Sequence, residues 1–205
     1  MPAIHPEILD QHQQDLLLLV SKFGHDFYLV GGTALALQYG HRRSLDFDLF
    51  TPKLFDNDHI RQQVRAAYPI EKTYLDSQGQ LTIQAHSIRL TFYQYPFTIS
   101  HPTNFAPPLT MPEPITIAAM KAFALGRRAK WKDYVDLYFV FQHHSLLEVV
   151  TEAQYVFGRE FNEKLFREQL AYHQDINYSD APIFMPGFAT DTPSILNFLI
   201  QISTS

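Results

Sequence analysis

Residues 29–50 read LVGGTALALQYGHRRSLDFDLF, and this stretch predicts the unit around which the fold is built. A glycine pair, Gly31 and Gly32, follows a short apolar run, and Asp46 and Asp48 alternate with apolar residues near its end. Residues 33–39 between them have the composition of a short helix, with a glycine stop after it. The stretch therefore predicts a strand, a glycine turn, a helix, a basic turn and a second strand.

The glycine pair and the basic turn favour a phosphate group as ligand. Gly31 and Gly32 lack a Cβ atom, so a ligand can approach main-chain N–H groups at the start of a helix, where the helix dipole favours an anion. His41, Arg42 and Arg43 add local positive charge. The sequence therefore predicts an anion site near residue 31.

The aspartate pair favours a metal ion. On a strand, the side chains of Asp46 and Asp48 share one face and the apolar side chains between them share the other. Two carboxylates roughly 7 Å apart repel each other unless a cation or hydrogen-bond donors lie between them. Hard oxygen ligands beside phosphates suit Mg²⁺. A lone glycine pair usually marks a turn and a lone Asp-x-Asp a solvated strand face; their order in one strand-helix-strand unit favours the metal-nucleotide interpretation.

The composition limits the class of protein. The chain has 205 residues, a hydrophobic fraction of 46%, a net charge of -5 and no cysteine. These values exclude a disordered chain, disulfide bonds and thiolate chemistry. No apolar run is long enough to span a bilayer and no secretory signal is visible, so we expect a cytoplasmic protein without a membrane partner. Any RNA contact would have to use a local basic patch.

The remaining elements follow from the periodicity of apolar residues. We expect an amphipathic helix over 6–23, a strand over 26–30 and a helix from Asp56 to about Tyr68, followed by antiparallel strands at 70–75, 80–85 and 88–95. Residues 96–114 carry six of the thirteen prolines and predict an irregular surface connection. Further helices are expected at 114–125, 127–142, 146–156, 159–172 and 194–202.

A second charged cluster lies in the segment KAFALGRRAKWKDYVDL, residues 121–137. Its basic members include Lys121, Arg128, Lys130 and Lys132, and its acids are Asp133 and Asp136, which share a helix face. Alone, the segment is as well explained by a solvated helix face with internal ion pairs. Beside a phosphate site, Lys121 could neutralise a nucleotide's phosphates, and Asp136 could orient that lysine or a basic neighbour.

These residues resemble the AbiEii/AbiGii nucleotidyltransferase-like family, bacterial toxins and relatives within the DNA polymerase β-like superfamily. The resemblance covers about residues 27–141. It rests on Gly31-Gly32-Thr33, Gly40-His41-Arg42, Ser44-x-Asp46-x-Asp48 with Phe50, and Lys121-x-x-Ala124-Leu125-x-x-Arg128-x-Lys130-x-Lys132-Asp133-x-x-Asp136-Leu137.

The resemblance implies an α+β fold, with a mixed or antiparallel sheet flanked by helices over residues 1–110 and a helical C-terminal region over 111–205. It also implies Mg²⁺-dependent transfer of a nucleotide from an NTP to an RNA or protein acceptor, often as a toxin opposed by an antitoxin protein. Asp46 and Asp48 would be the catalytic metal ligands. The nucleotide and its phosphates would be bound by Gly31, Gly32, Thr33, Arg42, Ser44, Lys121, Arg128, Lys130, Asp133 and Asp136.

One departure leaves catalysis open. The superfamily commonly places a third carboxylate on a later strand, where this chain has Thr91, and a threonine hydroxyl cannot act as a charged ligand or as a base. Asp76 or Glu71 could replace that acid. The alternatives are therefore a catalytically impaired NTP-binding or regulatory protein that keeps the fold, or a plain partner-binding domain of a toxin–antitoxin-like pair.

Overall fold

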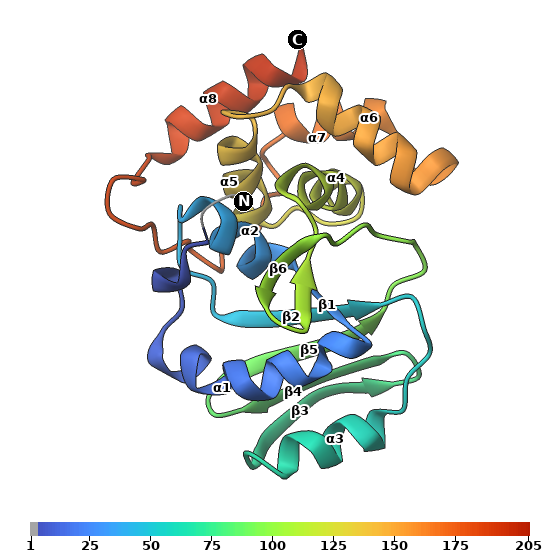
Figure 1. Cartoon of the computed structure of the whole chain (residues 1–205). Coiled ribbons are helices and arrows are strands. Elements are labelled where there is room, and N and C mark those ends of the chain that lie inside the picture. The colour runs from blue at the N-terminus through green and yellow to red at the C-terminus, as the bar shows by residue number, and fades with distance from the viewer. Residues whose placement is uncertain (1–3) are drawn as a thin grey trace. The chain divides into compact units, whose positions relative to one another are not determined.

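The structure is a computed structural model that describes residues 4–205 (Figure 1). It confirms the predicted α+β class. Its elements in chain order are η1 Pro6–Ile8, α1 Gln11–Lys22, η2 Phe23–His25, β1 Tyr28–Val30, α2 Gly31–Tyr39, β2 Asp46–Thr51, α3 Asn57–Arg65, β3 Ile70–Ser77, β4 Gln80–Ala85, β5 Ile88–Gln94, β6 Thr103–Ala106, β7 Leu109–Met111, α4 Pro114–Leu125, α5 Trp131–Val140, α6 Leu146–Phe157, η3 Gly158–Glu160, α7 Glu163–Ala171 and α8 Thr192–Ser203.

The chain forms two compact units. Unit 1 contains the residues up to Gln38 and Ser44–Glu113, and unit 2 contains Tyr39–Arg43 and Pro114–Ser205. The sequence suggested two continuous segments that meet near residue 110. The structure instead assigns the basic turn 39–43 to unit 2, because its backbone and side chains bond to α5 and to the segment that precedes α8.

Unit 1 is built on a five-stranded sheet with the order β1-β2-β5-β4-β3. Strands β2 and β5 run parallel, and the other neighbours are antiparallel. Alternation along β2, β4 and β5 creates one apolar face, whose side chains Phe47, Leu49, Leu81, Ile83, Leu90 and Phe92 are all 0% exposed. Helices α1 and α3 lie over this face in Figure 1, and Phe23 and Phe27, which follow α1, contact Phe92.

The opposite face of the sheet is polar, and the strand register determines which side chains meet there. Asp46 lies beside Arg89, and Asp48 lies beside Thr91, in the parallel pairing of β2 with β5. Gln84 of β4 lies beside Arg89 on the next strand. The predicted two-residue period therefore places both aspartates on the face opposite the apolar core.

Two segments of unit 1 differ from the sequence prediction. The helix expected over 6–23 is divided, because the side chain of Asp10 accepts a hydrogen bond from the N–H of Gln13 and starts α1 at Gln11. The connection over 96–114, expected to be irregular, contains the antiparallel pair β6 and β7. The helix start at Asp56 and the strand over 80–85 are confirmed.

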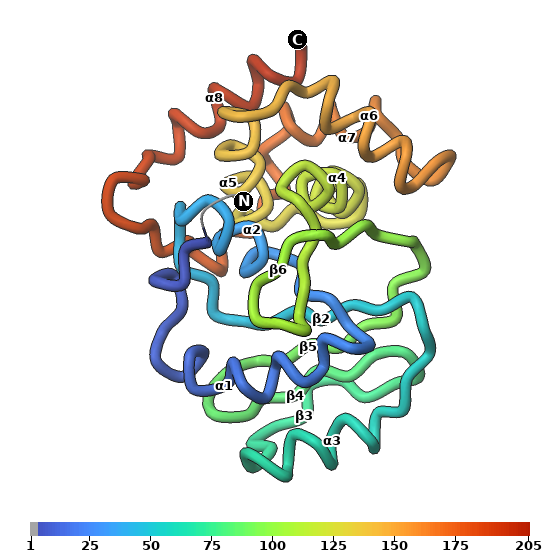
Figure 2. The backbone as a smooth tube through the Cα atoms, viewed as in Figure 1, coloured from blue at the N-terminus to red at the C-terminus, as the bar shows by residue number. Residues whose placement is uncertain are grey.

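Unit 2 is helical, as expected for the C-terminal region, and its helices α4 to α8 pack on one another. Helix α5 begins at Trp131 rather than near residue 127. The reason is that Ala129 and Trp131 form main-chain hydrogen bonds with Asn177, from the long connection between α7 and α8 traced in Figure 2. Among residues 4–205, no helix combines the length and apolarity needed to cross a bilayer.

Candidate functional site

The carboxylate of Asp48 lies against the backbone of the glycine turn. Gly31 has a φ of +72°, and a Cβ atom added there would collide with the Oδ2 atom of Asp48. Asp46 and Asp48 are half-buried, and Phe47 between them is 0% exposed. The fold therefore brings the glycine pair and the aspartate pair together inside unit 1.

Thr33 joins the start of α2 to the start of β2. Its side chain is only 1% exposed. The Thr33 Oγ1 atom lies 2.9 Å from the Oγ atom of Ser44 and donates a hydrogen bond to the main-chain oxygen of Asp46. Because this buried hydroxyl is used inside the protein, Thr33 holds Ser44 and the first aspartate in place.

We expect Gly31→Ala to destabilise the fold and to displace the Asp48 carboxylate. A non-glycine residue at positive φ costs about 1–2 kcal/mol, and the collision with Asp48 adds to this cost. Urea unfolding would measure the loss of stability. Gly187→Ala is the matched control, because Gly187 has a φ of +87° with nothing within 4 Å of the added Cβ. Equal losses in the two variants would contradict the close approach of Asp48.

The strand beside the aspartates supplies a hydroxyl and a cation but no acid. Thr91 lies directly beside Asp48, and the Nη1 atom of Arg89 lies 3.9 Å from the Oδ2 atom of Asp46. Alternation along β5 puts Arg89 on the face opposite the core, but only the β2–β5 register shows that it lies next to Asp46. Arg89 is therefore a site residue that sequence reasoning missed.

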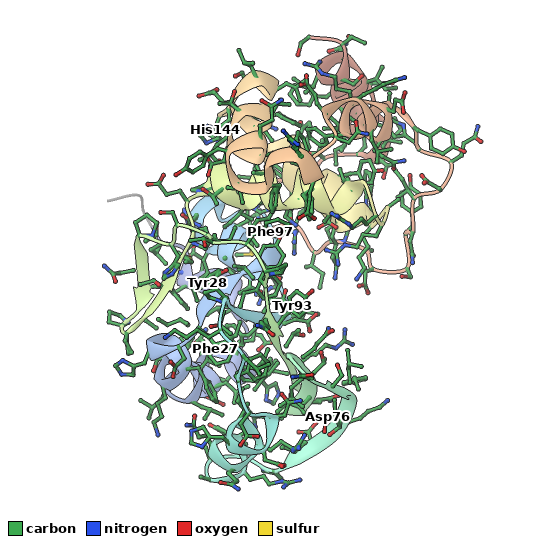
Figure 3. The ribbon with its side chains drawn as sticks, turned by 90° about the vertical axis from the view of Figure 1, so that its right-hand side faces the viewer. Phe27, Tyr28, Asp76, Tyr93, Phe97 and His144 are labelled. Carbon is green, nitrogen blue, oxygen red and sulfur yellow. The ribbon has the colours of Figure 1, made fainter. Side chains whose placement is uncertain are left out.

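The two acids considered as replacements for a third carboxylate lie elsewhere. Asp76, labelled in Figure 3, is paired with Leu81 on the face that α3 covers, and it binds Arg61 and Asn57. Glu71 accepts hydrogen bonds from the side chain of Gln84 and the main chain of Ser87. It belongs to β3, three strands and about 14 Å from β2. Neither acid is placed beside Asp48.

The donor set fits Mg²⁺ bound together with a nucleotide. Within residues 4–205, no group of three or more His, Asp or Glu side chains is placed to bind one metal ion. Two neighbouring carboxylates are nevertheless what Mg²⁺ commonly takes from a protein, because substrate phosphates and waters complete its octahedral shell. Asp46 and Asp48 thus fit the metal only in combination with a phosphate ligand.

Unit 2 contains a buried charge cluster centred on Asp136, which is 0% exposed. The Arg42 guanidinium donates from Nε to Oδ1 and from Nη2 to Oδ2 of Asp136, both at 2.7 Å. The Nε2 atom of His41 lies 2.8 Å from Oδ1, and the Lys121 ammonium lies 2.7 Å from Oδ2. One carboxylate thus contacts three basic side chains.

A second buried acid continues the cluster toward the surface. The Nζ atom of Lys121 donates to Oδ1 of Asp133 at 2.7 Å, and Arg128 lies 3.3 Å from Oδ2 of the same carboxylate. The side chain of Arg128 is 53% exposed, whereas that of Lys121 is 8% exposed. Lys130 is exposed at the start of α5. Arg128 and Lys130 are therefore the accessible cations among the predicted phosphate-binding residues of unit 2.

Charge pairing determines the protonation states in this cluster. Burial opposes ionisation of Asp136, but Arg42 and Lys121 outweigh it and hold the pKa of this carboxyl well below its usual range. Burial likewise opposes the charge on Lys121, but Asp133 and Asp136 raise the pKa of its ammonium. Burial lowers the pKa of His41 despite its bond to Asp136. His41 is therefore neutral near pH 7 and does not add the positive charge that the sequence suggested.

We expect the protein to lose stability as the pH falls from about 7.5 to about 5.5, partly through His41. The unfolded pKa of a histidine is about 6.5, and burial places the folded pKa below that value, so the unfolded state binds more protons between the two. The contribution is complete above the unfolded pKa and is lost as the pH falls. Urea midpoints at both pH values should differ less in His41→Gln. The exposed control His59→Gln should keep the wild-type difference; a wild-type difference in His41→Gln would contradict the assignment.

Sequence comparison places the candidate site within a known family. The model of the AbiEii family, described as nucleotidyl transferase AbiEii toxin, type IV TA system, matches residues 16–97. The chain is also 33% identical over 177 residues to the uncharacterised protein aq_aa25 of Aquifex aeolicus. The matched region covers 82% of this chain and 84% of that protein. The family match includes both glycines and both aspartates.

Solved structures share the fold. A candidate nucleotidyltransferase from Helicobacter pylori superposes with a TM-score of 0.62 at 19% identity, covering 96% of this chain and 95% of that one. MenT4, a nucleotidyltransferase toxin from Mycobacterium tuberculosis, superposes with a TM-score of 0.61 at 17% identity, covering 93% and 80% of the two chains. At these identities the likeness shows a common fold.

Proposed function

The chain belongs to the AbiEii nucleotidyltransferase toxin family, and from this we propose that it transfers a nucleotide from an NTP to an RNA or protein hydroxyl with the help of Mg²⁺. The observation that carries the proposal is the contact between the Asp48 carboxylate and the Gly31 turn, with Asp46 beside it on one strand face. This contact supports the proposal because carboxylate oxygens suit a hard cation and the N–H groups at the start of a helix suit phosphate.

Each predicted site residue that lies in unit 1 has a defined part in this proposal. Asp46 and Asp48 hold the cation, which would neutralise negative charge on the phosphates during transfer. The N–H groups of Gly31 and Gly32 and the hydroxyl of Ser44 bind phosphate oxygens. Thr33, at the start of α2, holds Ser44 and the start of β2 in place through its hydroxyl. Phosphoryl transfer depends mainly on such positioning and on charge stabilisation, so the site can act without a strong base.

The nucleotide-binding role of Lys121, Arg128, Lys130, Asp133, Asp136 and Arg42 stays a prediction. Lys121 and Arg42 are buried and direct their charges to the acids of unit 2. Their contribution is therefore to position neighbouring groups. Arg128 and Lys130 are the accessible cations of this set.

A specific observation favours the second function, a catalytically impaired NTP-binding protein. Thr91 occupies the place beside Asp48, and neither Asp76 nor Glu71 lies there. Neither of these two acids is then available next to Asp48 to take a proton from an acceptor hydroxyl. This protein would bind an NTP with Mg²⁺ and release it unchanged.

One experiment separates the two functions. The protein is incubated with Mg²⁺ and each α-labelled NTP, with total RNA or total cell protein as acceptor, and NTP binding is measured in parallel. We expect label in an acceptor with one or more NTPs and none when EDTA replaces Mg²⁺. Mg²⁺-dependent binding without label transfer would support the impaired protein instead, and the absence of binding would refute both.

The family also suggests a biological role. We propose that the protein acts in the cytoplasm as a toxin held in check by an antitoxin protein. Induced expression should then arrest growth, and coexpression of the neighbouring gene product should relieve the arrest. Growth arrest that persists in Asp48→Asn would separate the toxicity from nucleotide transfer.

A further inference from the structure

The polar face of the unit 1 sheet carries an exposed group of basic and aromatic side chains on the far side of β5 from β2. We call Lys72, Tyr74 and Arg89, with Gln84 between them, the Tyr74 patch. The Tyr74 ring lies 4.6 Å from the Nζ atom of Lys72 and 4.8 Å from the Cζ atom of Arg89. The Tyr74 hydroxyl donates a 2.6 Å hydrogen bond to the side-chain oxygen of Gln84. The hydrogen bond holds the ring in place, and both cations lie over it.

The patch is accessible and is continuous with the aspartate pair. Tyr74 is 43% exposed, and the side chain of Arg89 is 48% exposed. Arg89 contacts the Tyr74 ring and also lies 3.9 Å from Asp46, so it spans the distance between the patch and the predicted metal ligand. Glu71 also lies nearby, but both of its carboxylate oxygens accept hydrogen bonds from Gln84 and Ser87.

The strand order puts the predicted phosphate-binding glycines and the Tyr74 patch on opposite sides of β2. The phosphate-binding glycines follow β1 on one side of β2, and the patch lies beyond β5 on the other side. In phosphoryl transfer the attacking and leaving oxygens are roughly in line, so the acceptor approaches from the side opposite the leaving group. An acceptor would then reach Asp46 and Asp48 from the β5 side.

We propose that the Tyr74 patch binds single-stranded RNA as the acceptor of the transfer reaction; this inference rests on the proposed function. A base would take the place of one cation over the Tyr74 ring or stack on the guanidinium plane of Arg89. Lys72 and Arg89 would contact backbone phosphates. From β3 to β2 the distance is about 14 Å, which an RNA end of a few nucleotides would span. The net charge of -5 opposes binding of RNA elsewhere, so a local cationic and aromatic surface is required.

Fluorescence anisotropy with a labelled oligouridylate tests the patch without relying on transfer. We expect Tyr74→Leu to weaken binding roughly 5- to 150-fold through loss of stacking, whereas Tyr74→Phe, which keeps the ring, should bind within about 2-fold of wild type. Lys72→Gln should reduce the slope of log affinity against log salt by about 0.7. Tyr155→Leu on α6, at a tyrosine that is 85% exposed, is the matched control and should bind as wild type does.

The outcomes separate this inference from the proposed function. Equal affinity of wild type, Tyr74→Leu and Lys72→Gln would overturn it, as would an equal loss in Tyr155→Leu. Label transfer to a protein acceptor without RNA binding would also overturn it and leave the transferase function intact. RNA binding that follows the expected pattern without any label transfer would support the patch and refute the transferase function.

Discussion

Asp48→Asn is expected to lower nucleotide transfer by at least about 10²–10³-fold, the scale on which loss of one preorganised charge-stabilising group acts in other active sites. The amide keeps the shape of the carboxylate but not its charge, so the cation loses a ligand while the contact with Gly31 is retained. Asp46→Asn should have a similar effect. Each substitution removes one of two like charges, and Asp46→Asn also removes the exposed 3.9 Å ion pair with Arg89, so stability should change by less than about 1 kcal/mol in either variant. Label transfer and urea unfolding, measured side by side, check both expectations.

Asp76→Asn is the matched control for this result. It is the same substitution on another strand of the sheet, on the face that α3 covers, where Asp76 binds Arg61 and Asn57. Its transfer rate should equal that of wild type. A large loss in Asp76→Asn would show that this acid serves as the third carboxylate. Conversely, Thr91→Asp places an acid beside Asp48 and should raise the transfer rate if that acid is what the site lacks.

Asp136→Asn is expected to destabilise the protein by about 3–5 kcal/mol, the usual result of removing one partner of a buried ion pair. The substitution leaves the buried Arg42 guanidinium without its carboxylate and removes one of the two acids paired with Lys121. Urea unfolding measures the loss. An exposed pair provides the control: Glu168→Gln removes a 3.7 Å contact with Lys164 and should change stability by less than about 1 kcal/mol.

A double variant tests whether the unpaired buried charge or a loss of packing causes this loss of stability. Replacing both partners, with Arg42→Met and Asp136→Leu together, removes the buried charges as a pair, and such replacements are often nearly neutral. The double variant should therefore lose less stability than Asp136→Asn alone. A double variant that is less stable than Asp136→Asn would show that packing, and not the unpaired charge, accounts for the effect.

The sequence by itself determined the local features of the site. The two-residue period of a strand places Asp46 and Asp48 on one face and Phe47 on the other, whatever the partner strand is. A helix start depends on one nearby side chain, so Asp56 could be recognised as a cap. The glycine pair before a helix was readable for the same reason: the requirement for positive φ at Gly31 is a property of a single residue.

Only the tertiary structure decided which distant groups meet. His41 and Asp136 are 95 residues apart and form a buried bond. Burial keeps His41 neutral despite this bond, and the pairing with Asp136 directs Arg42 into the interior. The register between β2 and β5 places Thr91 beside Asp48, and Arg89 between Asp46 and the Tyr74 patch. Register and burial arise from the packing of side chains remote in the sequence, and no local pattern encodes them. The chain's own pattern therefore specifies the Asp-x-Asp strand and the glycine turn, and packing determines what surrounds them.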